Sequence, residues 1–302
     1  MIVVGGEALI DLIAGSDGRL SPMPGGGPYN TARTIARLGG EVSFLGRLSS
    51  DRFGRLLSAR LEADGVGTRL IVDTAYPTTL VLAEIDAQGV AHYSFYLVGT
   101  SVPGLNVADA RRAVDEVPDA LHVGTLGLTL EPMADALAQL VAEVPAETLV
   151  MVDPNCRPAA VPAPARYRER LMAVLHRADI VKVSAEDLDY LALAASYPAA
   201  ARVLVAAGAS VVLLTRGDRA VELYTEAGRW EVPVPRVTVV DTVGAGDAFG
   251  GGFLMRWLEQ GLGRAQLRDA DRLADAAAFA VRVAAITCGR AGAYPPTRAE
   301  LL

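Results

Sequence analysis

Apolar residues along the chain occur in short continuous runs that alternate with longer stretches of helical period. The runs are rich in β-branched residues and predict strands at Ile2–Gly5, Glu41–Leu45, Ala120–Val123, Leu149–Asp153, Ile180–Val183 and Val211–Thr215. The stretches between them predict helices at Asn30–Leu38, Asp51–Asp64, Glu131–Val144, Ala165–His176, Glu186–Leu193 and Ala199–Ala207. Strands that are apolar throughout, each followed by a helix, are typical of a parallel sheet covered on both faces. The pattern therefore predicts a doubly wound α/β fold with a mostly parallel sheet between two helical layers.

One region departs from this alternation and predicts a small β lid. Thr79–Ile85 and Ala91–Leu97 are strand-like runs joined by Asp86-Ala-Gln-Gly89, which is a hairpin signal. The residues after Asp11, through Ser16-Asp-Gly-Arg19 to Pro24, predict another strand pair. We therefore expect a single domain over residues 1–302, with the lid formed by segments at about 12–24 and 76–100.

The composition excludes several classes of function. The chain has 302 residues, of which 51% are hydrophobic, and its net charge of -7 argues against a nucleic acid or an anionic membrane as partner. Glu7 and Asp11 interrupt the apolar N-terminal segment, which lacks a basic region, so it is not expected to be a signal peptide. No apolar run approaches the roughly 20 residues that cross a bilayer. Cys156 and Cys288 form no CxxC pair, and we expect free thiols in the reducing cytoplasm.

Lys182 is the only Lys among the 28 Lys and Arg residues, for which a GC-rich coding bias is the simplest explanation. His92, His122 and His176 share no metal-ligand spacing, so a structural role is expected for each of them.

The sharpest motif is Val239-Val-Asp241-Thr-Val-Gly244-Ala245-Gly246-Asp247-Ala-Phe249. A β-branched run ends at Asp241, small residues follow, and a helical apolar pattern begins at Phe249. Gly244, Ala245 and Gly246 are therefore expected at a helix N-terminus, where unpaired N–H groups and the helix dipole favour an anion. Beside this anion hole, the Asp247 carboxylate can deprotonate a hydroxyl that attacks a phosphoryl group. An ordinary strand-to-helix turn capped by Asp247 is the alternative.

Two segments together resemble the signatures of one family. Asp241-Thr-Val-Gly-Ala-Gly-Asp-Ala-Phe249 is similar to the C-terminal signature of the ribokinase-like, or PfkB-type, carbohydrate kinases. Gly25-Gly-Gly-Pro-Tyr-Asn30-Thr-Ala, followed by Ala36-Arg-Leu-Gly39-Gly40 and Phe44-Leu-Gly46, is similar to their N-terminal signature. Weaker matches extend the resemblance over essentially the whole chain. It implies a ribokinase-like, Rossmann-like three-layer fold with a β lid, and an ATP-dependent kinase.

The resemblance also implies roles for individual residues. Asp247 matches the catalytic base, and Gly244, Ala245 and Gly246 match the anion hole. The residues that match a sugar-binding face are Asp11, Gly25, Gly26 and Asn30, although a solvated turn also explains Asp11. Asp153 and Arg157 follow a buried strand and are expected to face the ligand there, with Arg157 near phosphate oxygens. Tyr93 and Phe95 of the lid can close over the sugar.

The nucleotide site is expected at the ends of later strands. Lys182-Val-Ser184-Ala-Glu186-Asp187 resembles the family's Asn-x-x-Glu element, which orders Mg²⁺ and phosphate through water. Ser184 replaces Asn and Asp187 replaces Glu, so either Asp187 or Glu186 is the expected Mg²⁺ residue. The alternative is that these residues only form the start of a helix that is capped by Ser184.

Two further segments resemble nucleotide-binding elements of the family. Thr215-Arg-Gly217 resembles the turn that contacts the nucleotide, and Thr287-Cys-Gly-Arg290-Ala-Gly292 resembles the segment under the adenine. A plain loop is the alternative for the latter. The resemblance also implies a monovalent cation site, for K⁺, formed by Asp241, Val243, Thr287, Arg290 and Gly292.

The leading hypothesis for the function is an ATP-dependent sugar kinase with fructose as acceptor, because several motifs are similar to those of fructokinases. Tyr29 stands where fructokinases commonly have a small residue, and a phenol beside the sugar would favour 2-keto-3-deoxygluconate. A nucleoside kinase of the same fold is another alternative, with the lid aromatics on the base. A non-catalytic sugar sensor is a further alternative. A dinucleotide-binding oxidoreductase is disfavoured, because Gly5-Gly-Glu-Ala8 is not a GxGxxG sequence. In relatives such lids pair, so we expect a homodimer formed through the lid.

Overall fold

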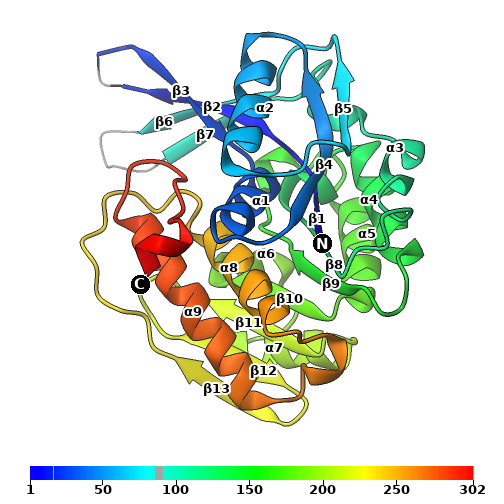
Figure 1. Cartoon of the computed structure of the whole chain (residues 1–302), viewed down its shortest axis with the longest axis vertical. Coiled ribbons are helices and arrows are strands. Elements are labelled where there is room, and N and C mark those ends of the chain that lie inside the picture. Colours follow the sequence, from blue (N-terminus) through cyan, green and yellow to red (C-terminus); the bar gives the residue numbers. More distant parts are fainter. Residues whose placement is uncertain (16, 86–90, 302) are drawn as a thin grey trace.

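The computed structural model describes residues 1–15, 17–85 and 91–301, and within them two sheets account for all the named strands. The large sheet has nine strands in the order β13-β12-β11-β10-β9-β8-β1-β4-β5 (Figure 1). Their bounds are Ile2–Gly5 (β1), Val42–Ser49 (β4), Ile71–Thr74 (β5), Ala120–Gly124 (β8), Leu149–Asp153 (β9), Ile180–Ser184 (β10), Val211–Thr215 (β11), Val221–Thr225 (β12) and Gly228–Val232 (β13). Pairing is parallel from β5 to β11, whereas β12 and β13 add an antiparallel edge.

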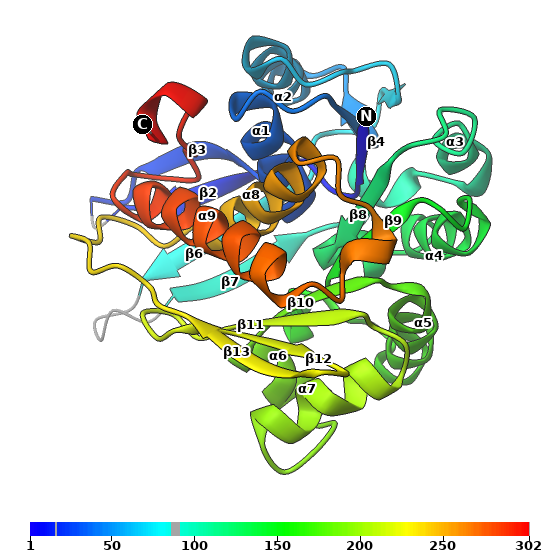
Figure 2. The same cartoon turned by 60° about the horizontal axis from the view of Figure 1, so that its bottom comes forward.

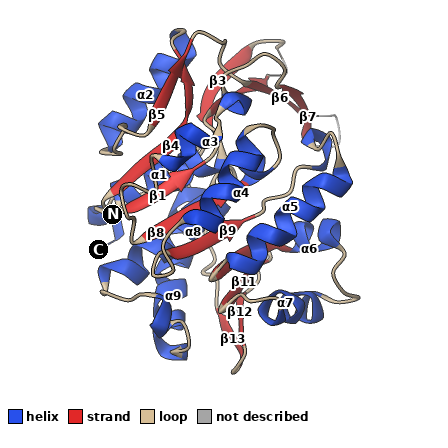
Figure 3. Cartoon of the chain, turned by 90° about the vertical axis from the view of Figure 1, so that its right-hand side faces the viewer, coloured by secondary structure: helices blue, strands red, loops and turns tan. Residues whose placement is uncertain are grey.

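Helices cover both faces of this sheet, as the three views show (Figures 1, 2 and 3). One face carries α1 (Gly27–Arg37), α2 (Arg52–Asp64), α8 (Ala245–Glu259) and α9 (Ala270–Cys288). The other carries α3 (Val107–Arg111), α4 (Met133–Glu143), α5 (Pro164–Arg177), α6 (Ala185–Leu191) and α7 (Tyr197–Ala206). Each face has its own apolar core, because strands buried on both sides point alternate side chains into opposite layers. The predicted doubly wound, three-layer fold is confirmed.

The second sheet has four strands in the order β3-β2-β6-β7 and stands apart from the large one, at the upper left of Figure 1. It consists of β2 (Leu9–Ala14), β3 (Leu20–Gly25), β6 (Leu80–Ile85) and β7 (Ala91–Tyr96). The two segments expected to form the lid contribute these strands. The predicted hairpin turn at Asp86–Gly89 lies outside the described residues, and so does Ser16 of the other loop.

The order of the strands creates a switch point beside β1. From β1 the chain proceeds to β4 on one side, and it later returns to β8 on the other. Ligands of open α/β sheets bind outside the carboxyl ends of the strands at such a point. The first residues after β1, β8, β9, β10 and β11 are therefore brought to one edge of the sheet, beneath the lid.

None of the helices in the described part of the chain combines the length and the apolar character that a membrane span requires.

Candidate active site

A cavity of about 1460 Å³ lies at this edge of the sheet and is the larger of the two principal hollows in the described residues. Its floor comes from the carboxyl ends of strands, with Glu7 after β1, Thr125 after β8, Asn155 after β9 and Ser184 at the end of β10. The lid forms the roof. The start of α8 and the segment around the end of α9 form another part of the wall. One continuous cavity therefore reaches from the lid to the loop that precedes α8.

One face of the lid sheet lines the cavity. Alternate residues of each strand do so, as expected for a pleated strand with period two: Leu9, Asp11, Ile13, Ser21, Met23, Val81, Ala83, Tyr93 and Phe95. Tyr93 and Phe95 lie among them, so the structure places both predicted lid aromatics on the cavity side. Among the described residues of the lid, the face toward the cavity is mainly apolar and carries one carboxylate, Asp11.

Asp247 occupies the first turn of α8 with its carboxylate facing this cavity. Gly244 precedes the helix in the left-handed conformation (φ 76°), and an added Cβ there would lie 2.5 Å from the Cβ of Ala293, so glycine is required on both counts. Ala248 donates the first bond to the Gly244 carbonyl, at 2.8 Å, so the N–H groups of Gly246 and Asp247 have no helical acceptor. Burial raises the pKa of Asp247 to about 6, although the hydrogen bond from Asn30 opposes the shift.

Asn30 connects α1 to Asp247 and still has a free acceptor. Its Nδ2 donates to Oδ2 of Asp247 at 2.9 Å, and the side chain is buried. Its Oδ1, however, has no hydrogen-bond partner among the described residues. Buried polar atoms are normally paired, so an acceptor left open beside a cavity points to a donor that arrives with a ligand, such as a hydroxyl group.

Asp11 of the lid is another carboxylate on the cavity wall. Burial raises its pKa to about 6, whereas the nearby Arg157 works in the opposite direction. Gly25 lies beside Asp11 on β3, and a Cβ added there would sit 2.1 Å from Oδ2 of Asp11. The glycine therefore makes room for the carboxylate. Gly26 and Gly27 continue the lining, and Gly26 has a positive φ of 111°.

Glu7 and Thr125 also line the cavity, and the sequence alone predicts no role for either residue. Glu7 is buried, and its carboxylate accepts bonds from Gly27 N at 3.0 Å and Gly127 N at 2.9 Å, so it ties the start of α1 to the turn after β8. Burial raises the pKa of Glu7 to about 8. Thr125 has φ 52°, which is a strained conformation for a β-branched residue, and Asn155 beside it has φ 38°. Only tertiary contacts reveal these residues, apart from the position of Glu7 just after the first strand.

A buried ion pair lies beneath the centre of the cavity. Nζ of Lys182 is 2.8 Å from Oδ2 of Asp153, and both side chains are almost inaccessible to solvent. Lys182 lines the cavity, whereas Asp153 lies beneath it. Arg157 lines the cavity as an exposed residue, and its guanidinium donates to the carbonyls of Asn155 and Cys156.

Ser184 and Asp187 form a capping box at the start of α6. Ser184 Oγ accepts from Asp187 N, while Oδ2 of Asp187 accepts from Ser184 N at 2.8 Å. The other oxygen of Asp187 accepts from Cys156 N at 2.6 Å. The alternative interpretation, in which Ser184 caps the helix, therefore describes the geometry of both Ser184 and Asp187. Glu186 lines the same part of the cavity with an exposed side chain, and Thr215 and Gly217 lie nearby on the lining after β11.

Hydrogen bonds to the Asp241 side chain connect the loop before α8 to the C-terminal segment. Oδ1 of Asp241 accepts from Val243 N at 3.0 Å and its Oδ2 from Gly292 N at 2.8 Å. Asp241, Val243 and Gly292 all line the cavity, whereas Thr287 and Arg290 are absent from the lining. Thr287 is buried and donates to the Val283 carbonyl, and Arg290 pairs with Glu300. Of the residues expected at the cation site, the structure thus brings three together on the cavity wall.

The expectation that Tyr29 lies beside the sugar is wrong. Tyr29 is fully buried between α1, α2 and β4, where its hydroxyl donates to the Leu57 carbonyl and its ring packs edge-on against Phe44. Helix α1 begins at Gly27, so Tyr29 is a helical residue and points about 100° away from Asn30. Arg33 also faces away from the cavity and pairs with Asp64.

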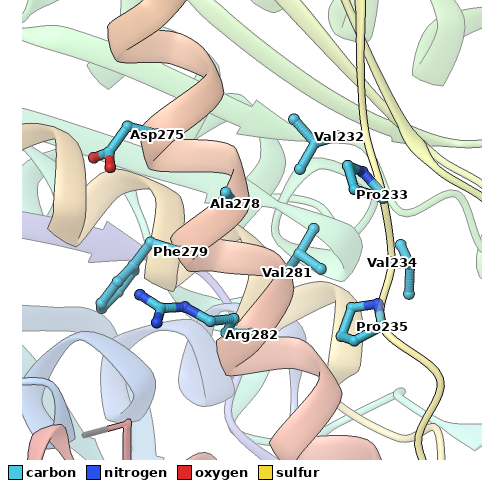
Figure 4. Close-up of a pocket in the computed structure, with 9 residues that line it drawn as sticks. All are labelled: Val232, Pro233, Val234, Pro235, Asp275, Ala278, Phe279, Val281 and Arg282. Atoms are coloured by element: carbon cyan, nitrogen blue, oxygen red, sulfur yellow. The ribbon is translucent and has the colours of Figure 1, made fainter.

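A second, smaller hollow of about 350 Å³ runs between α9 and the strip Val232–Pro235 (Figure 4). Its lining is mainly apolar, with Asp275 and Arg282 as its charged residues, and it contains none of the predicted site residues. Val234, Pro235 and Val281 line both hollows, so this groove abuts the part of the large cavity that α9 lines. The convergent polar groups lie in the large cavity, which we take as the active site.

Comparison with known proteins identifies the family. The model of the "pfkB family carbohydrate kinase" matches residues 1–300. The chain belongs to this family. Fructokinase-1 of Oryza sativa subsp. japonica is 33% identical over 314 residues, which cover 100% of this chain and 96% of the relative. The predicted family and the predicted ATP-dependent carbohydrate kinase activity are confirmed.

Solved structures of similar proteins agree with this assignment. Fructokinase from Xylella fastidiosa with bound ATP superposes on this kinase with a TM-score of 0.93, at 33% identity over 99% of this chain and 96% of the other. Fructokinase from Vibrio cholerae O395, in its fructose, ADP and calcium ion bound form, superposes with a TM-score of 0.86 at 27% identity, covering 99% and 97%. The ribokinase-like arrangement of this pfkB-family kinase is therefore confirmed.

Proposed function

We propose that this pfkB-family kinase transfers the γ-phosphoryl group of ATP to a hydroxyl of fructose. The observation that carries the proposal is the Asp247 carboxylate, which lies beside the open start of α8 and is bonded to Asn30, whose Oδ1 has no partner among the described residues. A base, a set of anion-binding N–H groups and an open acceptor for a hydroxyl thus lie side by side, where Asn30 of α1 contacts the start of α8. Phosphoryl transfer to an alcohol needs these three elements.

In the proposed mechanism Asp247 accepts the proton of the attacking hydroxyl. A pKa of about 6 keeps the carboxylate mostly ionised at neutral pH yet makes it a better proton acceptor than an ordinary Asp. The N–H groups of Gly246 and Asp247 stabilise the charge on the phosphoryl oxygens. Asn30 and Asp11 bind hydroxyls of the sugar, and Tyr93 and Phe95 cover it from the lid. Thr215 and Gly217 contact the nucleotide.

The charged and polar groups at the nucleotide end suit a Mg²⁺–ATP complex. Carboxylates are the preferred protein ligands of Mg²⁺, which when bound neutralises phosphate charge. We assign the interaction with Mg²⁺-bound water to Glu186, because both oxygens of Asp187 accept bonds from N–H groups of the protein. A K⁺ site near Asp241, Val243 and Gly292 belongs to the same proposal, and its remaining ligands would be carbonyls of the Thr287–Arg290 segment.

The charge at the lid end favours a neutral sugar over a sugar acid. The carboxylates of Asp11 and Asp247 face this part of the cavity. Arg157 and Lys182 are the nearby cations, and Lys182 is already paired with Asp153. A substrate carboxylate would lie close to both Asp11 and Asp247, and like charges in a partly buried site repel each other. The burial of Tyr29 removes the feature that pointed to 2-keto-3-deoxygluconate.

A panel of acceptors tests this proposal. With ATP and Mg²⁺ we expect fructose to give the highest kcat/KM among fructose, 2-keto-3-deoxygluconate, ribose and a purine nucleoside. The measurement is a coupled assay of ADP release with each acceptor. A kcat/KM at least about tenfold higher for the sugar acid, a transition-state preference of about 1.4 kcal/mol, would overturn fructose as the substrate. ADP release with none of them would favour a non-catalytic sugar sensor.

We also propose a homodimer formed through the lid. The edges of the lid sheet are β3 and β7, and they carry exposed apolar side chains, including Leu20, Met23, Tyr93 and Tyr96. Proteins usually cover such edges, and a second copy of the chain would also shield the sugar. Light scattering at about 50 μM should therefore give twice the mass of the chain, whereas a monomer at this concentration would contradict the proposal.

Cys156 and Cys288 are free thiols, which suits the cytoplasm as the proposed compartment.

A further inference from the structure

Lys182 occupies a position where a charged residue is costly. It lies in β10, near the middle of the nine-stranded sheet, and its neighbours Val181 and Val183 are fully buried. The Lys182 side chain has a relative exposure of 4% and pairs with Asp153 at 2.8 Å. A buried ion pair is often no more stabilising than apolar residues of similar volume. Stability of the sheet therefore does not account for this pair.

The ammonium group points at the start of α8. A Cβ added to Gly246 would lie 2.9 Å from Nζ of Lys182 and 3.7 Å from its Cε. The N-terminus of a helix carries a partial positive charge, so an ammonium group placed there is unfavourable unless an anion lies between the two. Carboxylates do hold the charge on Lys182: burial works to lower its pKa, but Asp153 and Asp187 outweigh burial and raise it. The two positive groups converge on the part of the cavity beside Asp247.

The chain uses Lys here and Arg at every other cationic position. A coding bias toward Arg explains the others but not the exception. An ammonium group is a compact point charge with three donors, whereas a guanidinium group is larger and planar. With Gly246 this close to Nζ, the larger group would meet the backbone of the anion hole. Within the described residues Asp153 accepts one hydrogen bond from Lys182 Nζ, and the other donors remain for a ligand.

We propose that Lys182 is a catalytic residue that contacts the transferring phosphoryl group, and that Asp153 is a positioning residue that holds Nζ against Gly246. The proposal deepens the proposed phosphoryl transfer and rests on it. The new bond joins the acceptor oxygen to the γ-phosphorus, and the bond to the β,γ-bridging oxygen breaks, leaving its electron pair on ADP. The hydroxyl proton passes to Asp247. Lys182 keeps its protons and stabilises the added negative charge on the phosphoryl oxygens.

Four variants test the proposal: Lys182→Met, Lys182→Arg, Asp153→Asn and the double variant Lys182→Met/Asp153→Asn. We expect kcat to fall about 10³-fold in Lys182→Met and about 10²-fold in Lys182→Arg, because the interaction is made mainly in the transition state. The dissociation constant for ADP, which lacks the transferred group, should stay within about threefold of the wild-type value. Asp153→Asn should lower kcat only about tenfold, because the ammonium group remains. Arg111→Lys, a surface position paired with Glu143, is the matched control for exchange of the cation and should leave kcat unchanged.

The double variant separates catalysis from charge balance. It removes both charges and leaves no unpaired ion in the interior, so it reports on the reaction even if Lys182→Met does not fold. If Lys182 is catalytic, the double variant is as inactive as the single Met variant. Recovery to within about tenfold of Asp153→Asn would show that Lys182 only balances Asp153, and it would overturn the proposal. A loss of more than about 10²-fold in Asp153→Asn alone would contradict its role as a positioning residue.

The rates are measured with the best sugar and also with water as the only acceptor. A wild-type protein that phosphorylates no sugar contradicts the proposed function, while its ATP hydrolysis still compares Lys182 with its variants. A wild-type protein that phosphorylates a sugar, together with a Lys182→Met variant that does so at a similar rate, contradicts only the role of Lys182.

Discussion

Replacing Asp247 by Asn should lower kcat for sugar phosphorylation by about 10³-fold, because the amide keeps the shape of the carboxylate but accepts no proton. The dissociation constant for ATP should change little, since the N–H groups of Gly246 and Asp247 remain at the helix start. Steady-state kinetics and calorimetric titration with a non-hydrolysable ATP analogue measure the two effects. Retention of more than about a tenth of the wild-type kcat would rule out Asp247 as the general base.

The dependence on pH gives this variant an independent readout. In the wild type the pKa of Asp247 is raised to about 6, so kcat should fall as the pH drops below about 6 and the base becomes protonated. The pKa of Asp11 is also about 6, so kcat/KM should fall more steeply than kcat, because sugar binding is lost together with the base. The residual kcat of Asp247→Asn should lack this acid limb.

The stability of Asp247→Asn serves as the control for folding. A carboxyl group whose pKa is higher in the folded than in the unfolded protein destabilises the fold as the pH rises through that range. Because the pKa of Asp247 rises from 3.8 to about 6 on burial, its ionised form lowers the free energy of unfolding at pH 8. Replacement by neutral Asn should therefore not lower the Tm at pH 8. A variant that is inactive with a lower Tm would leave misfolding as the cause of the lost activity.

The sequence predicts the buried part of the fold well because full burial leaves a clear pattern. The strands predicted at Ile2–Gly5, Leu149–Asp153 and Val211–Thr215 have the same bounds in the structure. The antiparallel edge, β12 and β13, is not predicted. β13 is mostly exposed, so it lacks the continuous apolar run that identifies the central strands.

The candidate site was predictable where its residues follow a local signal. The turn from Gly244 to Asp247 and the polar residues after β9 and β10 have such signals, and the structure places them around one cavity. Glu7 follows the first strand, but nothing local predicts its contacts, since its partners Gly27 and Gly127 are 20 and 120 residues away in the sequence. The prediction for Tyr29 is wrong for a local reason: the pattern predicts a helix that begins at Asn30, whereas α1 begins at Gly27 and turns the phenol into the core.

The second large loss of kcat is expected from Gly246→Val, a substitution in the proposed anion hole at the start of α8. The first added carbon would lie 2.9 Å from Nζ of Lys182, which is buried and paired with Asp153 and so has little freedom to move. The two further methyl groups would project from the helix start toward the place where the phosphoryl group must approach the N–H groups. We expect kcat to fall by at least about 10³-fold, because the loss combines a displaced cation with a blocked anion site.

A second glycine of α8 provides the matched control for this substitution. Gly250 lies one turn further along, where an added Cβ would meet the Met151 Cε at 3.4 Å and the His122 Nε2 at 4.0 Å, which are tolerable contacts. Gly250→Ala should retain wild-type kcat, and it should raise the free energy of unfolding slightly, because Ala is favoured over Gly inside a helix by about 1 kcal/mol. Gly246→Ala should already be impaired, since it brings the Cβ against Lys182 without the extra methyl groups of Val. Kinetics and thermal unfolding of the three variants measure these effects. Normal turnover by Gly246→Val would place the phosphoryl group elsewhere in the cavity, whereas a graded loss from Ala to Val at constant Tm would place it against the first turn of α8.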